Sequence, residues 1–204
     1  MSWDPYLDLD TGVLRNRLGI GDREELARAE AALTASRLYD LQRGHLPGGY
    51  DLEHLRSFHR VIFGDVYDWA GELRTVSIGR GGLFCLPQRL VPFAEELFGR
   101  LARDHHLRGL DRDTFVGRLA ALLAGINFLH PFREGNGRTQ RAFVAQLARD
   151  AGYRTRWALM DPAANVAASA AALRGDTGPL RELLDQLVVG PAGPVTDPPP
   201  PPFP

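Results

Sequence analysis

Apolar residues recurring at helical spacing are the feature that most constrains how this chain can fold. Leu26, Ala29 and Leu33 open one such stripe, which follows the capping residue Asp22 and ends at Gly44. The stripe continues through Ala32, Ser36 and Leu41, and no repeat of 20 to 50 residues is present. These patterns predict an all-α fold. The expected helices cover residues 22–44, 51–62, 90–101, a stretch from Asp111 or Asp113 to 126, 137–151, 162–173 and 179–188.

One segment has a different pattern. Residues 73–78 (Leu-Arg-Thr-Val-Ser-Ile) alternate in polarity and include β-branched side chains. Glycines follow at 79, 81 and 82, and an apolar stretch resumes at 83–85. A glycine turn between two such stretches is typical of a β-hairpin. We therefore expect one short hairpin within an otherwise helical protein.

The cationic side chains are all arginine. The chain has 24 of them and no lysine, against 25 acidic residues, so its net charge is -1. A general nucleic-acid coat needs a positive excess, and direct binding to nucleic acid is therefore not expected. The absence of lysine excludes a P-loop, a Schiff-base lysine and the strand lysine of protein kinases.

We expect a single domain over residues 1–190, with the N-terminal segment 1–21 packed on it. Residues 191–204 form a proline-rich tail that should be disordered. Cys85 is the single cysteine, so no internal disulfide can form. The start of the chain is unlike a signal peptide, and the longest apolar run, 119–129, is too short to cross a membrane. These features predict a soluble cytoplasmic protein with no membrane contact.

Residues 130–141 (His-Pro-Phe-Arg-Glu-Gly-Asn-Gly-Arg-Thr-Gln-Arg) carry most of the potential chemistry. Pro131 disfavours a helical conformation at His130 and so places this imidazole on a turn beside the core. The sequence Gly135-Asn136-Gly137 allows a tight turn that directs several N–H groups at one point. At a helix N-terminus, such a turn is an anion site.

Charged side chains surround this turn. Arg138 and Arg141 lie three positions apart and share a helix face, where two planar guanidinium groups suit a polyphosphate. Glu134 adds one carboxylate, and Mg²⁺ bridging phosphates often has only one or two protein ligands. Each residue taken alone is better explained as part of a structural loop. Together they indicate phosphoryl or nucleotidyl transfer.

The segment 130–141 resembles, without interruption, the signature of the Fic domain family, His-Pro-Phe-x-Glu-Gly-Asn-Gly-Arg-x-x-Arg. Residues 65–74 look like the segment leading into that family's flap, and residues 6–20 are similar to the start of the small FicT-type toxins. The resemblance covers roughly residues 5 to 190. It implies the Fic fold, a helical bundle with one short β-hairpin as the flap.

The resemblance also implies roles for individual residues. His130 would be the general base, and Glu134 would hold Mg²⁺ between the phosphates of the substrate ATP. The hairpin from Arg74 to about Phe84 would be the flap on which an extended segment of the target protein docks. The implied nucleotide-binding residues are Gly135, Asn136, Gly137, Arg138, Arg141, Thr75 and Val76.

The implied function is a protein adenylyltransferase that transfers AMP from ATP to a hydroxyl side chain of a target protein. The FicT likeness implies that it is the toxin of a toxin–antitoxin pair. Self-inhibited family members carry a Ser/Thr-x-x-x-Glu-Gly/Asn helix whose glutamate pairs with the second arginine of the motif. No serine or threonine here has Glu four residues later, and the nearest approach is Ser36 with Asp40. The resemblance therefore implies a separate small antitoxin with a Ser-x-x-x-Glu-Gly helix that reaches Arg141. It suggests type II topoisomerase subunits as candidate targets.

Two other functions compete with this interpretation. A Fic-type enzyme could transfer a different phosphate-containing group, either phosphate or phosphocholine. A catalytically silent module could use the flap only to bind peptides, although His130 and Glu134 would then have no purpose. Family members that transfer phosphate have a lysine at the position of Gly137, and this chain has none, which favours adenylyl transfer.

Overall fold

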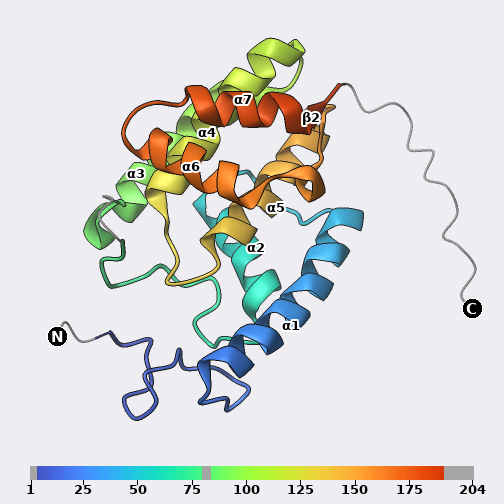
Figure 1. Ribbon diagram of the computed structural model, residues 1–204. Coiled ribbons are helices and arrows are strands. Elements are labelled where there is room, and N and C mark those ends of the chain that lie inside the picture. The colour runs from blue at the N-terminus through green and yellow to red at the C-terminus, as the bar shows by residue number, and fades with distance from the viewer. Residues whose placement is uncertain (1–3, 80–83, 191–204) are drawn as a thin grey trace, which may run out of the picture.

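The computed structural model describes residues 4–79 and 84–190, and these residues form seven α-helices (Figure 1). Three short 3₁₀ turns and two very short strands complete the regular structure. The mostly helical fold expected from the sequence is confirmed. The helices are α1 (Arg23–Arg43), α2 (Leu52–Phe63), α3 (Leu90–Arg103), α4 (Arg112–Leu129), α5 (Asn136–Asp150), α6 (Pro162–Leu173) and α7 (Gly178–Leu187).

Three helices begin at aspartate caps that the sequence identifies. The side chains of Asp22, Asp51 and Asp111 each accept a hydrogen bond from the backbone N–H three residues later. Each cap satisfies one of the free N–H groups of the first turn, and its negative charge suits the helix dipole. Of the two aspartates considered for α4, Asp111 is the cap.

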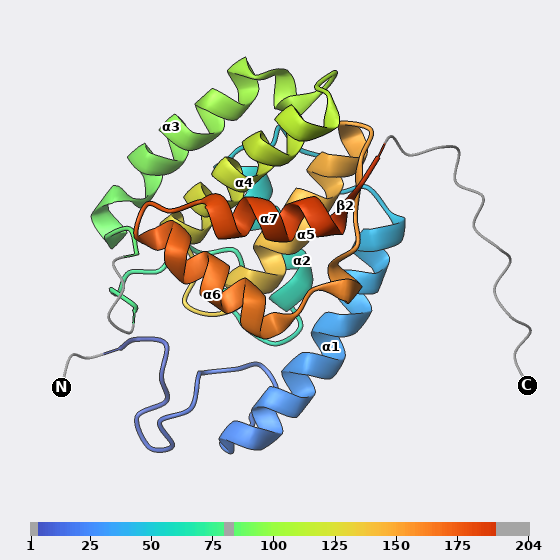
Figure 2. The same cartoon turned by 45° about the horizontal axis from the view of Figure 1, so that its top comes forward.

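Helices α4 and α5 lie in the middle of the molecule and pack against each other. Helix α2 packs on α5 and also on α1, which runs along one edge, while α6 and α7 cover α4 from the other side (Figure 2). Side chains of Leu119, Phe143 and Leu147 are fully buried in this centre. The start of α5 is thereby held between three helices. None of the helices formed by residues 4–79 and 84–190 combines the length and the hydropathy needed to cross a membrane.

The buried face of α1 differs from the expected stripe. The side chains of Leu26, Glu30, Thr34 and Leu41 are the buried ones, whereas Ala32 and Ser36 of the expected stripe are exposed. The helix is therefore turned so that two polar side chains face the protein interior. This rotation brings Glu30 to the functional site described below.

The strands lie outside the segment where a hairpin was expected. Strand β1 (Arg154–Thr155) pairs antiparallel with β2 (Val188–Val189), close to the end of the described chain. Within the expected hairpin, residues 73–79 and 84–85 are described and contain no strand, while the turn residues 80–83 lie outside the described part. The alternating pattern at 73–78 thus corresponds to irregular chain that bends at Thr75 and Val76 and forms no ladder in the described residues.

The Arg74 side chain takes over part of the linking that a ladder would provide. Its guanidinium donates to the carbonyl oxygens of Val76 (2.8 Å) and Cys85, which belong to the two sides of the expected hairpin. It also donates to the carbonyl oxygen of His130 (2.7 Å). Arg74 is only 2% exposed, and burial lowers the pKa of its guanidinium. One buried cation therefore joins both described sides of this segment to the loop before α5.

Residues 4–21 pack against the same region. Tyr6 lies edge-on to Trp69, with ring centroids 5.4 Å apart, and its hydroxyl accepts a hydrogen bond from the backbone N–H of Thr75 (3.2 Å). Asp4 forms an ion pair with Arg133 (2.9 Å) in the loop before α5. The N-terminal segment thus contacts both the expected flap and the candidate catalytic loop.

Candidate active site

His130 is the last residue held by α4, and it has a left-handed conformation with φ 41° and ψ 59°. Its N–H still bonds to the carbonyl oxygen of Ile126 (3.0 Å), so the helix fixes the backbone at this point. Pro131 follows directly, and its ring disfavours a helical conformation at the residue before it. The turn that the sequence predicts at His130 is confirmed.

The imidazole of His130 is oriented for use as a base. Its Nδ1 lies 3.2 Å from the carbonyl oxygen of Asn127, which can only accept, so Nδ1 carries the proton. The lone pair of Nε2 accepts no hydrogen bond from the residues that the structure describes. The ring stacks on Phe84, with centroids 3.9 Å apart. Burial, assisted by the positive charge of Arg74, lowers the pKa of His130 to about 4. The side chain is therefore neutral at physiological pH.

Gly135 begins helix α5 in a conformation that other residues rarely adopt, with φ 79°. A Cβ atom at this position would also lie 2.3 Å from the Phe63 ring. No side chain caps the N-terminus of α5, so the N–H groups of Asn136 and Gly137 have no partner among side chains of residues 4–79 and 84–190. Free N–H groups at the positive end of a helix dipole form an anion site.

The side chain of Arg141 lies over this site. Its Nη1 is 3.2 Å from the point where a Cβ of Gly137 would be, so glycine leaves room for the guanidinium. Burial, and secondarily the charge of Arg138, lower the pKa of Arg141. In the described part of the chain, no hydrogen bond or ion pair involves this guanidinium. A half-buried cation of this kind favours an anionic ligand.

Arg138 is fixed by protein contacts. Its guanidinium pairs with Glu30 of α1 and donates to the Thr34 hydroxyl (3.1 Å), and it covers the Phe63 ring at 4.7 Å. Tyr67 donates its hydroxyl hydrogen to the second oxygen of Glu30, and burial raises the pKa of that hydroxyl. The two arginines of the motif therefore differ, since Arg138 is paired within the protein and Arg141 is not.

Glu134 provides one partly exposed carboxylate beside the anion site. Its Oε1 accepts a hydrogen bond from the N–H of Gly135 (2.9 Å) and lies 3.9 Å from Nη2 of Arg138. No group of three or more His, Cys, Asp or Glu side chains that could hold a metal occurs in residues 4–79 and 84–190. A single carboxylate fits a Mg²⁺ ion that takes its other ligands from phosphates and water.

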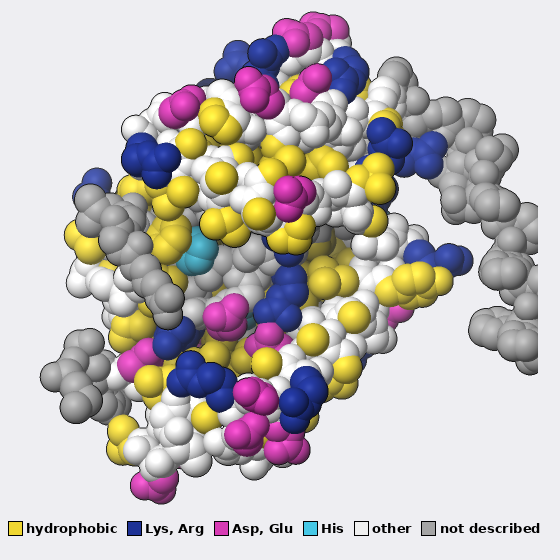
Figure 3. Space-filling model, viewed as in Figure 1, with side chains coloured by type: hydrophobic (Ala, Val, Ile, Leu, Met, Phe, Trp, Pro, Cys, Tyr) yellow, Lys and Arg dark blue, Asp and Glu magenta, His cyan; other side chains and the backbone are white. Residues whose placement is uncertain are grey.

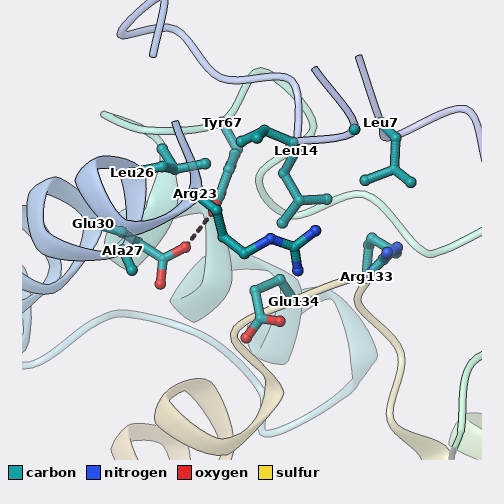
Figure 4. Close-up of a pocket in the computed structure, with 11 residues that line it drawn as sticks. Leu7, Leu14, Arg23, Leu26, Ala27, Glu30, Tyr67, Arg133 and Glu134 are labelled. Carbon is teal, nitrogen blue, oxygen red and sulfur yellow. Dashed lines mark hydrogen bonds between the residues drawn. The ribbon is translucent and has the colours of Figure 1, made fainter. Parts of the chain in front are cut away.

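Two hollows flank the start of α5. One, of about 430 Å³, is lined by Arg23, Glu30, Tyr67, Arg133 and Glu134 together with apolar side chains (Figure 4). The other, of about 580 Å³, includes Arg138 and Arg141 and runs between α1, α5 and residues 154–159. Figure 3 shows the face of the molecule seen in Figure 1. This face is hollowed near its middle, with arginine and acidic side chains around the hollow and a histidine at its edge.

The structure uses the remaining expected site residues as follows. The side chain of Asn136 bonds in both directions to the main chain of Phe132 (2.9 and 2.8 Å) and thus closes the loop, while its N–H remains at the anion site. Phe132 is fully buried and anchors the loop in the core. Thr75 and Val76 lie beside Arg74, which connects them to His130. Their contact with a nucleotide stays a prediction.

Comparison with known proteins agrees with this geometry. A profile of the Fic/DOC family matches residues 49–148. The protein adenylyltransferase VbhT of Bartonella schoenbuchensis is 45% identical over 76% of the chain, which spans 32% of VbhT. The probable protein adenylyltransferase y4lH of Sinorhizobium fredii is 39% identical over 91% of the chain and 96% of its own length. The chain belongs to the Fic/DOC family.

A solved Fic/DOC structure shares the fold. The N-terminal Fic domain of a VirB-translocated Bep effector protein from Bartonella quintana, with bound ADP, superimposes with a TM-score of 0.86. The alignment covers 91% of this chain and 95% of that domain at 26% identity. With relatives named as protein adenylyltransferases at about 40% identity over most of its length, the chain is a nucleotidyltransferase of this Fic/DOC class.

Sequence reasoning missed three residues that support the Fic/DOC motif. One of them, His59 of α2, is fully buried. Its Nδ1 accepts from the N–H of Gly71 (2.8 Å), so Nε2 carries the proton and donates to the carbonyl oxygen of Glu134 (3.0 Å). Glu30 and Tyr67, described above, were also overlooked. A polar residue on the apolar face of a helix was the available signal for His59.

Proposed function

We propose that this protein transfers AMP from ATP to a hydroxyl side chain of a target protein and that His130 is the base. One observation carries the proposal: a neutral imidazole with a free Nε2 lies at one end of the loop whose other end is an uncapped helix N-terminus beside Arg141. A base next to a polyphosphate site is the arrangement that nucleotidyl transfer to a hydroxyl requires.

In the proposed reaction, the hydroxyl oxygen of the target attacks the α-phosphorus of ATP. The bond between the α-phosphorus and the oxygen bridging to the β-phosphate breaks, and pyrophosphate leaves. The hydroxyl proton passes to Nε2 of His130. The N–H groups at the start of α5, with Arg138 and Arg141, hold the phosphates and offset the charge that develops on them.

Glu134 would hold the Mg²⁺ that accompanies the nucleotide. Two observations fit Glu134 to this ion. Its side chain is 47% exposed, and its hydrogen bond with Gly135 places the carboxylate at the edge of the anion site. When bound, Mg²⁺ would neutralise phosphate charge. The protein's own part is to keep the carboxylate in place through the hydrogen bond from Gly135 N–H.

Gly137 supports AMP as the transferred group. Its missing side chain leaves room for the guanidinium of Arg141, 3.2 Å from where a Cβ would be. A lysine there, the mark of family members that transfer phosphate, would crowd Arg141 and add a like charge. Transfer of phosphate or phosphocholine remains the alternative within the family, and silent peptide binding is the alternative outside it.

We further propose that the enzyme is the toxin of a toxin–antitoxin pair. The hollow of about 580 Å³ beside Arg141 supports this idea. It is bordered by Leu38 and Leu41 of α1 and by the 65% exposed Leu159. An amphipathic antitoxin helix with a Ser-x-x-x-Glu-Gly sequence could pack there and place its glutamate against Arg141. The test is whether such a helix, added as a peptide, stops AMP transfer by the wild type while an alanine version at the glutamate does not.

The target would dock beside the expected flap, and type II topoisomerase subunits are candidate targets. Leu86 and Val91 are 56% and 44% exposed just after this segment and could contact it. A supercoiling assay with gyrase incubated with the protein and ATP tests this candidate. If purified topoisomerase subunits take up no AMP, the candidate is rejected.

The decisive experiment compares two labels of ATP. The protein is incubated with Mg²⁺ and a bacterial lysate, with either α-labelled or γ-labelled ATP, and His130→Ala serves as the control. Label on protein from α-labelled ATP only, absent with His130→Ala, supports AMP transfer. Label from γ-labelled but not α-labelled ATP would overturn it in favour of phosphate transfer. No label from either would overturn it in favour of phosphocholine transfer or a silent module.

A further inference from the structure

Glu30 is a buried carboxylate that the proposed mechanism does not use. It lies on α1, 108 residues before Arg138, and it is 9% exposed. Each of its oxygens has its own donor, because Arg138 donates to Oε1 (2.5 Å) and Tyr67 donates to Oε2. Figure 4 shows the Glu30 carboxylate in the same hollow as Glu134, with its bond to Tyr67. A buried charge with both oxygens paired is held in one position.

Arg138 has a second carboxylate within reach. Its Nη2 lies 3.9 Å from Oε1 of Glu134, four residues earlier at the start of the same helix. A glutamate four residues before an arginine is the favourable order for an ion pair on a helix surface. At present the guanidinium is held on the other side by Glu30 and Thr34. Removing the charge of Glu30 would leave Glu134 as the nearest carboxylate to Arg138.

This geometry has a consequence for the cation site. An ion pair between Arg138 and Glu134 would occupy the carboxylate expected to hold Mg²⁺. An arginine has five N–H donors, and the contacts with Glu30 and Thr34 use two of them. The others stay available to phosphate oxygens.

We infer that Glu30 is a positioning residue: by pairing with Arg138 it keeps Glu134 free for a divalent cation and fixes Arg138 for the nucleotide phosphates. The inference rests on the proposed function, in which Glu134 holds Mg²⁺. Tyr67 assists by holding the second oxygen of Glu30. The effect of Glu30 on the cation site is exerted entirely through Arg138. A double-mutant cycle of Glu30 and Arg138 can therefore test it.

The test uses Glu30→Gln, which preserves shape but removes the charge. Binding of a non-hydrolysable ATP analogue is measured by calorimetry over a series of Mg²⁺ concentrations. We expect the Mg²⁺ concentration for half-maximal enhancement of binding to rise about tenfold, in line with loss of one partly buried charge pair. Glu24→Gln, on an exposed position of the same helix (87% exposed side chain), is the matched control and should not change it.

The cycle is completed in an Arg138→Gln background. There the Glu30→Gln substitution should leave the Mg²⁺ dependence unchanged, because no guanidinium remains to capture Glu134. An unchanged Mg²⁺ dependence in folded Glu30→Gln would overturn the inference. So would an equal shift when Glu30→Gln is introduced into the Arg138→Gln protein. Glu30→Asp, a shorter acid, should retain most of the wild-type Mg²⁺ dependence and serves if Glu30→Gln does not fold.

A crystal structure of Glu30→Gln without nucleotide separates this inference from the proposed function. We expect Arg138 to move to within about 3 Å of Glu134, the ordinary distance of a charge-assisted hydrogen bond. If Arg138 stays at its wild-type position, the inference is wrong even when the enzyme binds ATP. If the wild type binds no Mg²⁺ and ATP analogue at all, the proposed function fails, and the position of Arg138 alone decides the role of Glu30.

Discussion

His59 donates a hydrogen bond from Nε2 to the main-chain carbonyl oxygen of Glu134, 3.0 Å away. Its other ring nitrogen accepts from Gly71, and its ring stacks on Phe132 with centroids 3.9 Å apart. One imidazole of α2 therefore holds the loop that carries the Glu134 carboxylate. Burial lowers the pKa of His59 to about 4, so it remains neutral and retains this donor–acceptor pattern at neutral pH.

We expect His59→Phe to destabilise the protein although the aromatic ring is kept. The substitution leaves the buried N–H of Gly71 and the carbonyl of Glu134 without partners, at a cost of about 2 to 4 kcal/mol in the free energy of unfolding. Urea denaturation measures it. His45→Ala is the comparison, because the His45 side chain is 55% exposed and its bond to Asp150 lies at the surface. An equal loss in both variants would contradict the role assigned to His59.

The pH dependence of AMP transfer should follow His130. Because burial lowers the pKa of its imidazole to about 4, the base is already deprotonated at pH 6. We expect the contribution of this base to kcat/KM to be flat from pH 6 to 8 and to fall as the pH approaches 4. Single-turnover labelling with α-labelled ATP measures the profile. An acid limb centred near 6.5 would show that the imidazole titrates as in water.

The free energy of unfolding has to be measured over the same pH range, because protonation of His59 destabilises the folded protein as the pH falls. Its pKa is about 4 in the folded protein and about 6.5 when unfolded, so the unfolded chain binds the extra proton between these values. The contribution of His59 to the free energy of unfolding is therefore constant above pH 6.5 and falls by about 1.4 kcal/mol per pH unit between pH 6.5 and 4. Rates should be measured well below the melting temperature at each pH.

Gly135→Ala should be among the most damaging single changes in the motif. Alanine would have to adopt φ 79° and would place its Cβ 2.3 Å from the Phe63 ring, which is fully buried. We expect a loss of more than about 3 kcal/mol, combining backbone strain with overpacking. Gly152→Ala isolates the strain, since Gly152 has φ 90° but open space around it. It should cost about 1 to 2 kcal/mol, as measured by the same denaturation curves.

The sequence predicts the parts of this protein that depend on neighbouring residues. Asp22, Asp51 and Asp111 define helix starts because a cap acts within three residues. The turn at His130 and the uncapped start of α5 follow from Pro131 and Gly135 for the same reason. Rules that act between neighbouring residues were therefore sufficient to predict the fold class and the local backbone of the candidate site.

Contacts between distant elements could not be read in this way. Glu30 reaches Arg138 only because α1 packs with Glu30 and Thr34 inward, whereas an apolar stripe through Ala32 and Ser36 was the simpler interpretation. Similarly, alternation at residues 73–78 predicts a strand, but in the described residues the carbonyls of Val76 and Cys85 are bonded by the Arg74 side chain. Tertiary packing decides both outcomes, and no short-range pattern encodes it.

The two arginines of the motif should separate in their effects on stability and on nucleotide binding. Arg141 has no partner in the described residues, so Arg141→Gln should leave the free energy of unfolding within about 0.5 kcal/mol of the wild type. It should raise the KM for ATP at least about tenfold through loss of one charge-assisted phosphate contact. Arg138→Gln breaks the pair with Glu30, whose side chain is 12% exposed, and should cost about 3 kcal/mol of stability as well as activity.

Thermal denaturation and initial rates at varied ATP measure both effects, and Arg100→Gln provides the control. Arg100 is an exposed arginine on α3 whose nearest acid, Glu96, lies 3.8 Å away at the surface, so neither quantity should change. If Arg141→Gln proves as destabilising as Arg138→Gln, then Arg141 is a structural residue. Its open guanidinium would then not be the phosphate ligand, and the proposed antitoxin contact would lose its physical basis.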